Sequence, residues 1–200
     1  MASRNLSHFG LLAALLAPAA VASADELTIC YNYGCSAKAQ VDFGGAQLES
    51  LRAALAAAGD AGAERAAISR VIGRMYAIAG EQTPVWRDKG GNFADGGVNG
   101  QMDCIDHSTN TDNFLGLLQA HGWLRFHEVM ERIERTRYIF AVHWSARIRD
   151  RATQRAYVVD SWYFDNGHPA AVFPVEEWLA GNDPDAPQDA VSELPKRPPI

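Results

Sequence analysis

The chain has 200 residues, with 18 Lys or Arg against 24 Asp or Glu, and its formal net charge is −6. An acidic chain is not attracted electrostatically to nucleic-acid phosphates or to an anionic membrane surface, so we expect neither as a partner. A hydrophobic content of 48% excludes a disordered chain and suits one domain with a sizeable core.

Residues 1–24 have the composition of a secretory signal peptide. Arg4 precedes the apolar run Phe9 to Val21, and Ala22-Ser23-Ala24 is a small-x-small pattern of the kind that signal peptidase cleaves. The apolar run is shorter than the about 20 residues that a membrane-spanning helix needs. We therefore expect cleavage after Ala24, a periplasmic or secreted mature protein, and no stable membrane insertion. Loss of Arg4 makes the mature chain one charge more negative.

Three cysteines follow this segment. Cys30 and Cys35 are close in sequence, and in an oxidising compartment such a pair most simply forms a disulfide, with Gly34 easing the turn. Cys104 is then unpaired. An unpaired cysteine of an exported protein is a reactive thiol, half of an intermolecular disulfide or a small buried hydrophobe, and its neighbours must decide among these.

Helices are expected in the first part of the mature chain. Apolar residues at helical spacing predict one helix over residues 46–57 and a second over 63–79, with Gly80 placed to end the second. A glycine-rich loop at 81–102 either lines a cleft or is a solvent-exposed connector. A third helix is predicted to begin at Cys104 and to end near residue 121.

Strands are expected after the third helix, because apolar residues there recur at every second position, as they do in a β-strand with one buried face. A polar turn at 149–154 joins two of them as an antiparallel hairpin. Residues 176–179 are expected to form a short helix, and residues 181–200, rich in Pro and Asp, a flexible tail. Residues 25–180 then form a single domain. The predicted strands cover residues 126–133, 138–148 and 156–162.

The residues around Cys104 favour a reactive thiol. Asp103 is a candidate N-cap of the third helix, and Asp106, three residues on, has capping-box spacing. Cys104 then occupies the first helical position, where unpaired N–H groups and the helix dipole stabilise a thiolate. The two neighbouring carboxylates oppose this effect, so the thiolate needs a positive partner.

His143 and Asp160 are the expected partners. A thiol nucleophile needs a histidine to take its proton, and a third group to orient the imidazole. His143 lies within one predicted strand and Asp160 near the end of the next, and the hairpin brings them roughly opposite each other.

Other residues compete for these roles. Asp165 and Asn166 are substitutes for Asp160. His107 lies three residues from Cys104 on nearly the same helix face and is the rival base, although a supporting or surface role is favoured because same-helix neighbours rarely place the imidazole suitably. His121 and His127 are expected at a helix end and on a strand surface.

Three segments carry a resemblance to the transglutaminase-like cysteine peptidase superfamily, whose bacterial branch includes periplasmic papain-like proteins. They are Gly100 to His107, Val142 to Ser145, and Tyr157 to Trp162. The order of cysteine, histidine followed by an aromatic residue, and aspartate on the next strand resembles that of the family. The polar run at 106–111 departs from the family pattern.

The resemblance implies an α+β fold in which the nucleophile-bearing helix packs on an antiparallel sheet. It also implies Cys104 as nucleophile, His143 as base and Asp160 as orienter. Gln101, just upstream, is an oxyanion candidate through its side-chain amide. Such a site attacks an amide of a protein or peptide substrate and forms an acyl-enzyme, which water hydrolyses or an amine accepts.

Two non-enzymatic alternatives remain open at this stage. The chain is either a catalytically silent version of the fold that serves as an envelope binding module, or an envelope protein that Cys104 links into a dimer. A zinc site is not expected, because no Cys-x-x-Cys or His-x-x-x-His spacing supports the ligand-type residues near Cys104, and no cofactor is expected.

Overall fold

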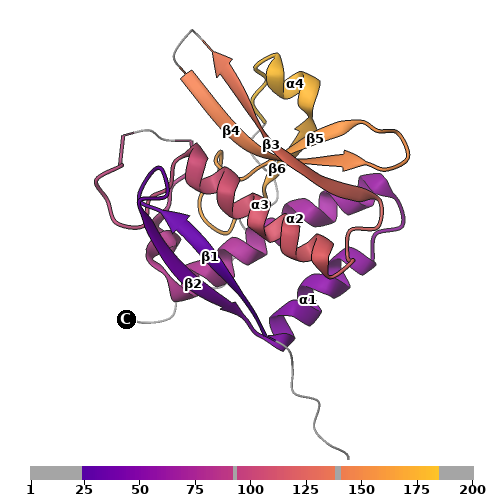
Figure 1. Cartoon of the computed structure of the whole chain (residues 1–200), viewed down its shortest axis with the longest axis horizontal. Coiled ribbons are helices and arrows are strands. Elements are labelled where there is room, and N and C mark those ends of the chain that lie inside the picture. Colours follow the sequence, from indigo (N-terminus) through magenta and orange to yellow (C-terminus); the bar gives the residue numbers. More distant parts are fainter. Residues whose placement is uncertain (1–23, 92–93, 138–140, 185–200) are drawn as a thin grey trace, which may run out of the picture.

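A computed structural model describes residues 24–91, 94–137 and 141–184 (Figure 1). The predicted signal peptide lies outside the described residues except for Ala24. The described chain is α+β, as predicted, with helices and two antiparallel sheets. Its elements are β1 (Asp25–Tyr31), β2 (Ala37–Phe43), α1 (Gly45–Ala56), α2 (Ala61–Gln82), the 3₁₀ helix η1 (Pro84–Arg87), α3 (Cys104–Ala120), β3 (His127–Arg137), β4 (Ala141–Asp150), β5 (Ala156–Asp160), β6 (Ala171–Pro174) and α4 (Val175–Leu179).

The larger sheet has the strand order β3-β4-β5-β6, and all its pairs are antiparallel. Its β4–β5 hairpin is the one predicted from the sequence. The register pairs Ala146 with Val159, and extending it places His143 across from Trp162. Asp160 is therefore the diagonal neighbour of His143 on the same face of the sheet, rather than its direct partner.

Helices cover the larger sheet unequally. The long helix α3 packs against β3, β4 and β5, whereas the short α4 packs against β5 and β6 (Figure 1). Alternation along β5 separates the two faces, because Val159 joins the main core whereas Asp160 meets Trp178 of α4. The His143–Asp160 pair therefore lies toward α4, and Cys104, the first residue of α3, still comes close enough to interact with His143.

The main core fills the space between the helices, the β1–β2 hairpin and the inner face of the larger sheet. Apolar residues spaced three or four apart give α1 and α2 their buried stripes, and alternate residues of β4 and β5 face them. Burial at this interface is the main stabilising contribution to the fold. Fully buried members include Ile29, Phe43, Leu51, Leu55, Ile68, Ile72, Met75, Phe114, Leu115, Leu118, Ile148 and Val159.

The β1–β2 hairpin was not predicted. The Cys30–Cys35 disulfide, which joins the end of β1 to the connecting turn, was predicted and is confirmed. The hairpin lies beside α3 (Figure 1), where the Asn110 side chain accepts from the backbone N–H of Cys30 at 2.7 Å and donates to its carbonyl at 2.8 Å.

Several predicted boundaries differ from the structure. The strand predicted to end at residue 133 continues as β3 to Arg137, and the predicted loop over 81–102 begins with the end of α2 and contains η1. Helix α2 continues past Gly80 to Gln82. Gly80 is a close-packing position instead of a helix end, because a Cβ there would approach Asn166 Nδ2 to 2.7 Å and the Trp86 Cβ to 3.1 Å. Strand β5 ends at Asp160 rather than residue 162. Strand β6 was not predicted.

The expected flexible tail begins with anchored residues. Asp183 accepts from Arg135 at 3.0 Å and from the Tyr163 hydroxyl at 3.2 Å, so this part of the expected tail is held against the domain. The rest of the expected tail, residues 185–200, lies outside the described residues. Among the described residues, no helix is long and apolar enough to cross a membrane.

Candidate active site

Helix α3 begins at Cys104, as the capping pattern predicted. The Asp103 carboxylate accepts from the backbone N–H groups of Ile105 at 3.0 Å and of Asp106 at 2.9 Å, and Asp106 accepts in return from the N–H of Asp103 at 3.3 Å. This capping box leaves Cys104 at the first helical position, where the helix dipole favours a negative charge. The thiol is partly exposed and unpaired.

The disulfide turn sits on these two carboxylates. The N–H of Gly34 donates to Asp103 at 3.0 Å, and the N–H of Cys35 donates to Asp106 at 2.5 Å. Residues 32–35 all have positive φ, between 60° and 66°, which Gly34 and Asn32 tolerate but which is costly for Tyr33 and Cys35. The disulfide and these contacts hold the unusual turn and supply both carboxylates with hydrogen-bond donors.

Asp106 is buried, and its pKa is raised to about 6. Burial is the main cause and the nearby charge of Asp103 adds to it, whereas the backbone donors act in the opposite direction. The raised pKa reduces the negative charge that Asp106 places beside the thiol at mildly acidic pH.

His143 and Asp160 form a buried pair at hydrogen-bond distance. The Nε2 of His143 lies 2.7 Å from Oδ2 of Asp160, and the side chains are 9% and 1% exposed. Asp160 also accepts from the indole Nε1–H of Trp178 at 3.2 Å and from the backbone N–H of Trp162 at 3.2 Å. Because a carboxylate only accepts, Nε2 carries a hydrogen, and the tautomer is fixed by this network.

Aromatic rings surround the imidazole. The ring centroids of Trp162, Tyr163 and Trp178 lie 4.9, 5.8 and 5.7 Å from that of His143. Arg135, the cross-strand partner of His143, stacks over Trp178 at 4.6 Å and donates to its backbone carbonyl. These contacts exclude water and fix the plane of the ring.

The pKa of His143 is raised to about 9. Burial is the largest single effect and lowers the pKa, but the hydrogen bonds and charges of Asp160 and Cys104 together outweigh it. Nδ1 is buried and has no partner of hydrogen-bond geometry among the described residues. The thiol lies beside the same strand, with Sγ 3.9 Å from the carbonyl oxygen of Val142. Cys104 thus lies near enough to influence the imidazole, whose second nitrogen is uncommitted.

Gln101 is buried and engaged elsewhere. Its amide donates to the carbonyl of Arg87 at 2.7 Å and accepts from the N–H of Lys89 at 3.1 Å, so it ties the loop after η1 to the start of α3. The role of Gln101 in holding an oxyanion stays a prediction.

The rival base, His107, points into the protein. Its Nε2 lies 2.9 Å from Asp88 and its Nδ1 lies 2.9 Å from the Ser161 hydroxyl, and the ring is 3% exposed. Both nitrogens are therefore committed away from solvent. The substitutes for Asp160 are committed too, since Asp165 pairs with Lys89 at 2.5 Å and Asn166 donates to the carbonyl of Tyr76 at 3.2 Å.

The remaining histidines lie away from Cys104. His121 ends α3 as expected and pairs with Asp25 at 2.7 Å. His127 is fully buried and lies 2.8 Å from Glu64, so the prediction of a surface position was wrong. The partner on α2 is distant in sequence, and strand alternation alone did not reveal it.

The glycine-rich loop packs against the turn that follows β5. A Cβ at Gly90 would collide with the backbone of Phe164, and the N–H of Gly91 donates to the carbonyl of Trp162 at 2.8 Å. The loop therefore lies beside the residues that enclose His143. Sequence reasoning missed three residues around the site, Trp178, Arg135 and Asp88, because each reaches it only through tertiary contacts.

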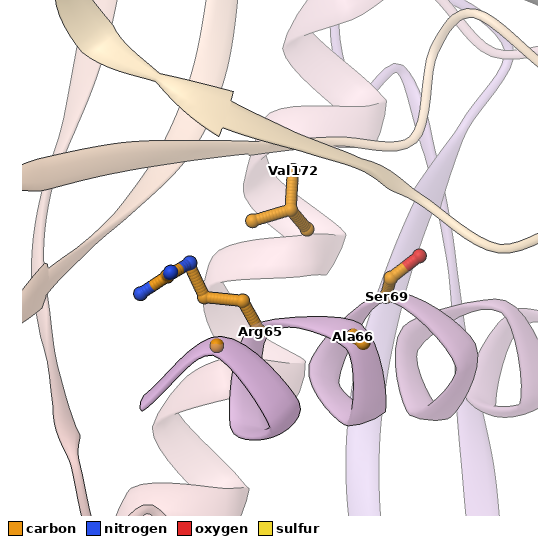
Figure 2. Close-up of a pocket in the computed structure, with 5 residues that line it drawn as sticks. Arg65, Ala66, Ser69 and Val172 are labelled. Carbon is orange, nitrogen blue, oxygen red and sulfur yellow. The ribbon is translucent and has the colours of Figure 1, made fainter. Parts of the chain in front are cut away.

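Two other places in the described part of the chain have groups or space that could suit a ligand. The sulfur atoms of Cys30 and Cys35 lie close to the Asp106 carboxylate, but the disulfide leaves no thiolate to hold a metal. A cavity of about 310 Å³ between α2 and β6 is lined by Arg65 and Val172 among others, and contains no residue of the candidate site (Figure 2). Its arginine already stacks on Tyr157 at 4.2 Å.

Comparison with known proteins finds no matching family model, curated protein or solved structure.

Proposed function

We propose that the protein is an exported thiol enzyme that acts on amide bonds of protein or peptide substrates through Cys104, His143 and Asp160. The observation that carries this proposal is the His143–Asp160 hydrogen bond of 2.7 Å beside a cysteine at a helix N-terminus. The buried and uncommitted Nδ1 of His143 supports it, since a thiol is the group that this nitrogen would serve.

The proposed chemistry follows from these groups. The Cys104 thiolate, paired with the His143 imidazolium, attacks the carbonyl carbon and forms a C–S bond. When the C–N bond breaks, the imidazolium gives its proton to the leaving amine, and a thioester remains on Cys104. Water or a second amine, deprotonated by neutral His143, then attacks the thioester and releases the thiol.

Asp160 would act through the histidine. Its carboxylate holds the imidazole in one tautomer and stabilises the positive charge that the ring carries in the ion pair. The resemblance to transglutaminase-like cysteine peptidases supports the same three roles. A catalytically silent fold that serves as an envelope binding module is the alternative, and it predicts an unreactive thiol.

A direct test is the burst of p-nitrophenolate from p-nitrophenyl acetate, with intact-mass detection of the acetylated protein. We expect one acetyl group per chain on Cys104 of the mature protein, no adduct with Cys104→Ser, and a strongly slowed burst with His143→Ala. His168→Ala, which removes a histidine outside the site, is the control. Acetylation of wild type at the rate of the His143→Ala variant would contradict the proposal.

A further inference from the structure

A second cluster of a serine, a histidine and an aspartate lies inside the protein, next to the candidate site. It consists of Asp88, His107 and Ser161, joined by distances of 2.9 Å on either side of the imidazole. The three residues are 1%, 3% and 6% exposed. No substrate reaches a serine buried in this way, so the cluster is not a second hydrolytic site despite its composition.

Each member of the cluster belongs to a segment that carries part of the candidate site. His107 lies one turn after Cys104 on α3. Ser161 directly follows Asp160. Asp88 uses its second carboxylate oxygen to accept from the N–H of Met102, two residues before Cys104, at 2.7 Å.

The direction of the hydrogen bond to Asp88 is fixed by chemistry, because a carboxylate only accepts and Nε2 of His107 must therefore carry a hydrogen. The Ser161 hydroxyl lies 2.9 Å from Nδ1 of His107 and donates to the Tyr76 hydroxyl at 3.2 Å. The Thr111 hydroxyl lies 3.0 Å from Ser161, and the Tyr76 hydroxyl lies 2.9 Å from the carbonyl of His107, to which it donates. Every polar side-chain atom of the cluster therefore has a partner.

We propose that Asp88, His107 and Ser161 form a positioning clamp that sets Cys104 against the His143–Asp160 pair. An apolar cluster of the same volume would stabilise the fold at least as well, because burying polar groups carries a desolvation cost. Directional bonds add orientation, and a displacement of about 1 Å at reacting groups can lower a rate about a hundredfold. The functional meaning of the clamp rests on the proposed function, although the geometry that it sets does not.

A second buried pair offers a matched control. Glu64 and His127 are both fully buried and 2.8 Å apart, but His127 lies at the β3 end that pairs with Asp150, whereas His143 pairs with Arg135 near the other end. Glu64→Gln thus perturbs a similar histidine–carboxylate contact away from Cys104. The ionisable groups that face His107 are Asp88 and Tyr76, and those that face His143 are Asp160, Cys104, Tyr163 and Arg135.

The test follows the NMR titration of the His143 imidazole in wild type, Cys104→Ala, Ser161→Ala, Asp88→Asn and Glu64→Gln. Cys104→Ala gives the size of the contribution that the thiol makes to the His143 pKa. We expect Ser161→Ala and Asp88→Asn to lower this pKa toward the Cys104→Ala value, and Glu64→Gln to leave it unchanged. If either clamp variant is folded and its His143 has the same pKa as in wild type, the proposal is overturned.

The alkylation rate of Cys104 by iodoacetamide at pH 6.5, measured on the same variants, separates this inference from the proposed function. A fall of about tenfold or more in the clamp variants, with Glu64→Gln at the wild-type rate, supports both. If wild type is already unreactive while the clamp variants still shift the His143 titration, the proposed enzyme is wrong and the clamp stands. Equal rates in a reactive wild type and the clamp variants would overturn the clamp alone.

Discussion

The imidazole of His143 meets the carboxylate of Asp160 on the diagonal of the β4–β5 hairpin, with Nε2 2.7 Å from Oδ2. This contact uses one ring nitrogen and leaves Nδ1 uncommitted. The hairpin register therefore decides which nitrogen serves the thiol, and it fixes the tautomer that a general base needs.

Asp160→Asn is expected to lower the pKa of His143 from about 9 to about 6.5 or below. The carboxylate supplies a hydrogen bond and a charge that, together with those of Cys104, outweigh the burial of the ring, and an amide keeps the shape without the charge. An NMR titration of the His143 ring protons measures this change. A pKa that stays near 9 would show that Asp160 is not the source of the shift.

The stability of the fold is expected to depend on pH through His143. Because the folded pKa of about 9 lies above the ordinary value of 6.5, the contribution of the protonated ring is complete below pH 6.5 and is lost as the pH rises through 9. Urea unfolding should therefore show the largest stability difference between wild type and His143→Gln near pH 6. A difference that is constant from about pH 6 to about pH 10 would contradict this expectation.

Trp178→Phe is expected to destabilise the protein by about 1 kcal/mol, because phenylalanine keeps a ring against His143 but loses the N–H that donates to Asp160. Leu179→Ala, at the exposed neighbouring position, is the matched control and should be close to neutral. Chemical unfolding measures both variants. Equal effects of the two substitutions would mean that the indole hydrogen bond contributes nothing.

The double variant Cys30→Ser, Cys35→Ser is expected to lose about 2 kcal/mol of stability, the magnitude for closing a short loop. The costly positive-φ turn adds to the loss when the cross-link is removed. Unfolding of the mature protein under non-reducing conditions is the measurement. Thiol titration of native wild type should find the single free cysteine, Cys104, and finding three would refute the disulfide.

Local signals were enough to predict the start of α3 and the β4–β5 hairpin. Asp103 and Asp106 act within three residues of each other, and the alternation of β4 and β5 is a property of adjacent segments. The predicted residues Cys104, His143 and Asp160 were found from these two elements. Their geometry in the structure is consistent with the prediction, although the diagonal register was not foreseen.

Features that depend on contacts between residues far apart in the chain could not be predicted from the sequence. Strand β1 mixes polar and apolar residues, and it is recognisable only once it pairs with β2 and packs on α3. A glycine at position 80 predicts a helix end, but in the structure Gly80 allows close packing against Trp86. His127 was predicted to be on the surface because its partner, Glu64, lies on α2 and no local pattern points to it. The Asp88–His107–Ser161 clamp joins three segments and leaves no local pattern.

The central claim, a Cys104–His143 pair, is tested most directly by the pH dependence of Cys104 alkylation by iodoacetamide in the mature protein, with wild type compared to His143→Ala. An ordinary cysteine reacts appreciably only as the pH approaches its pKa of about 8.5. We predict substantial reactivity of wild type at about pH 6 and its loss in His143→Ala. Reactivity that rises only near pH 8.5, identically in both proteins, would contradict the pair and the enzyme built on it.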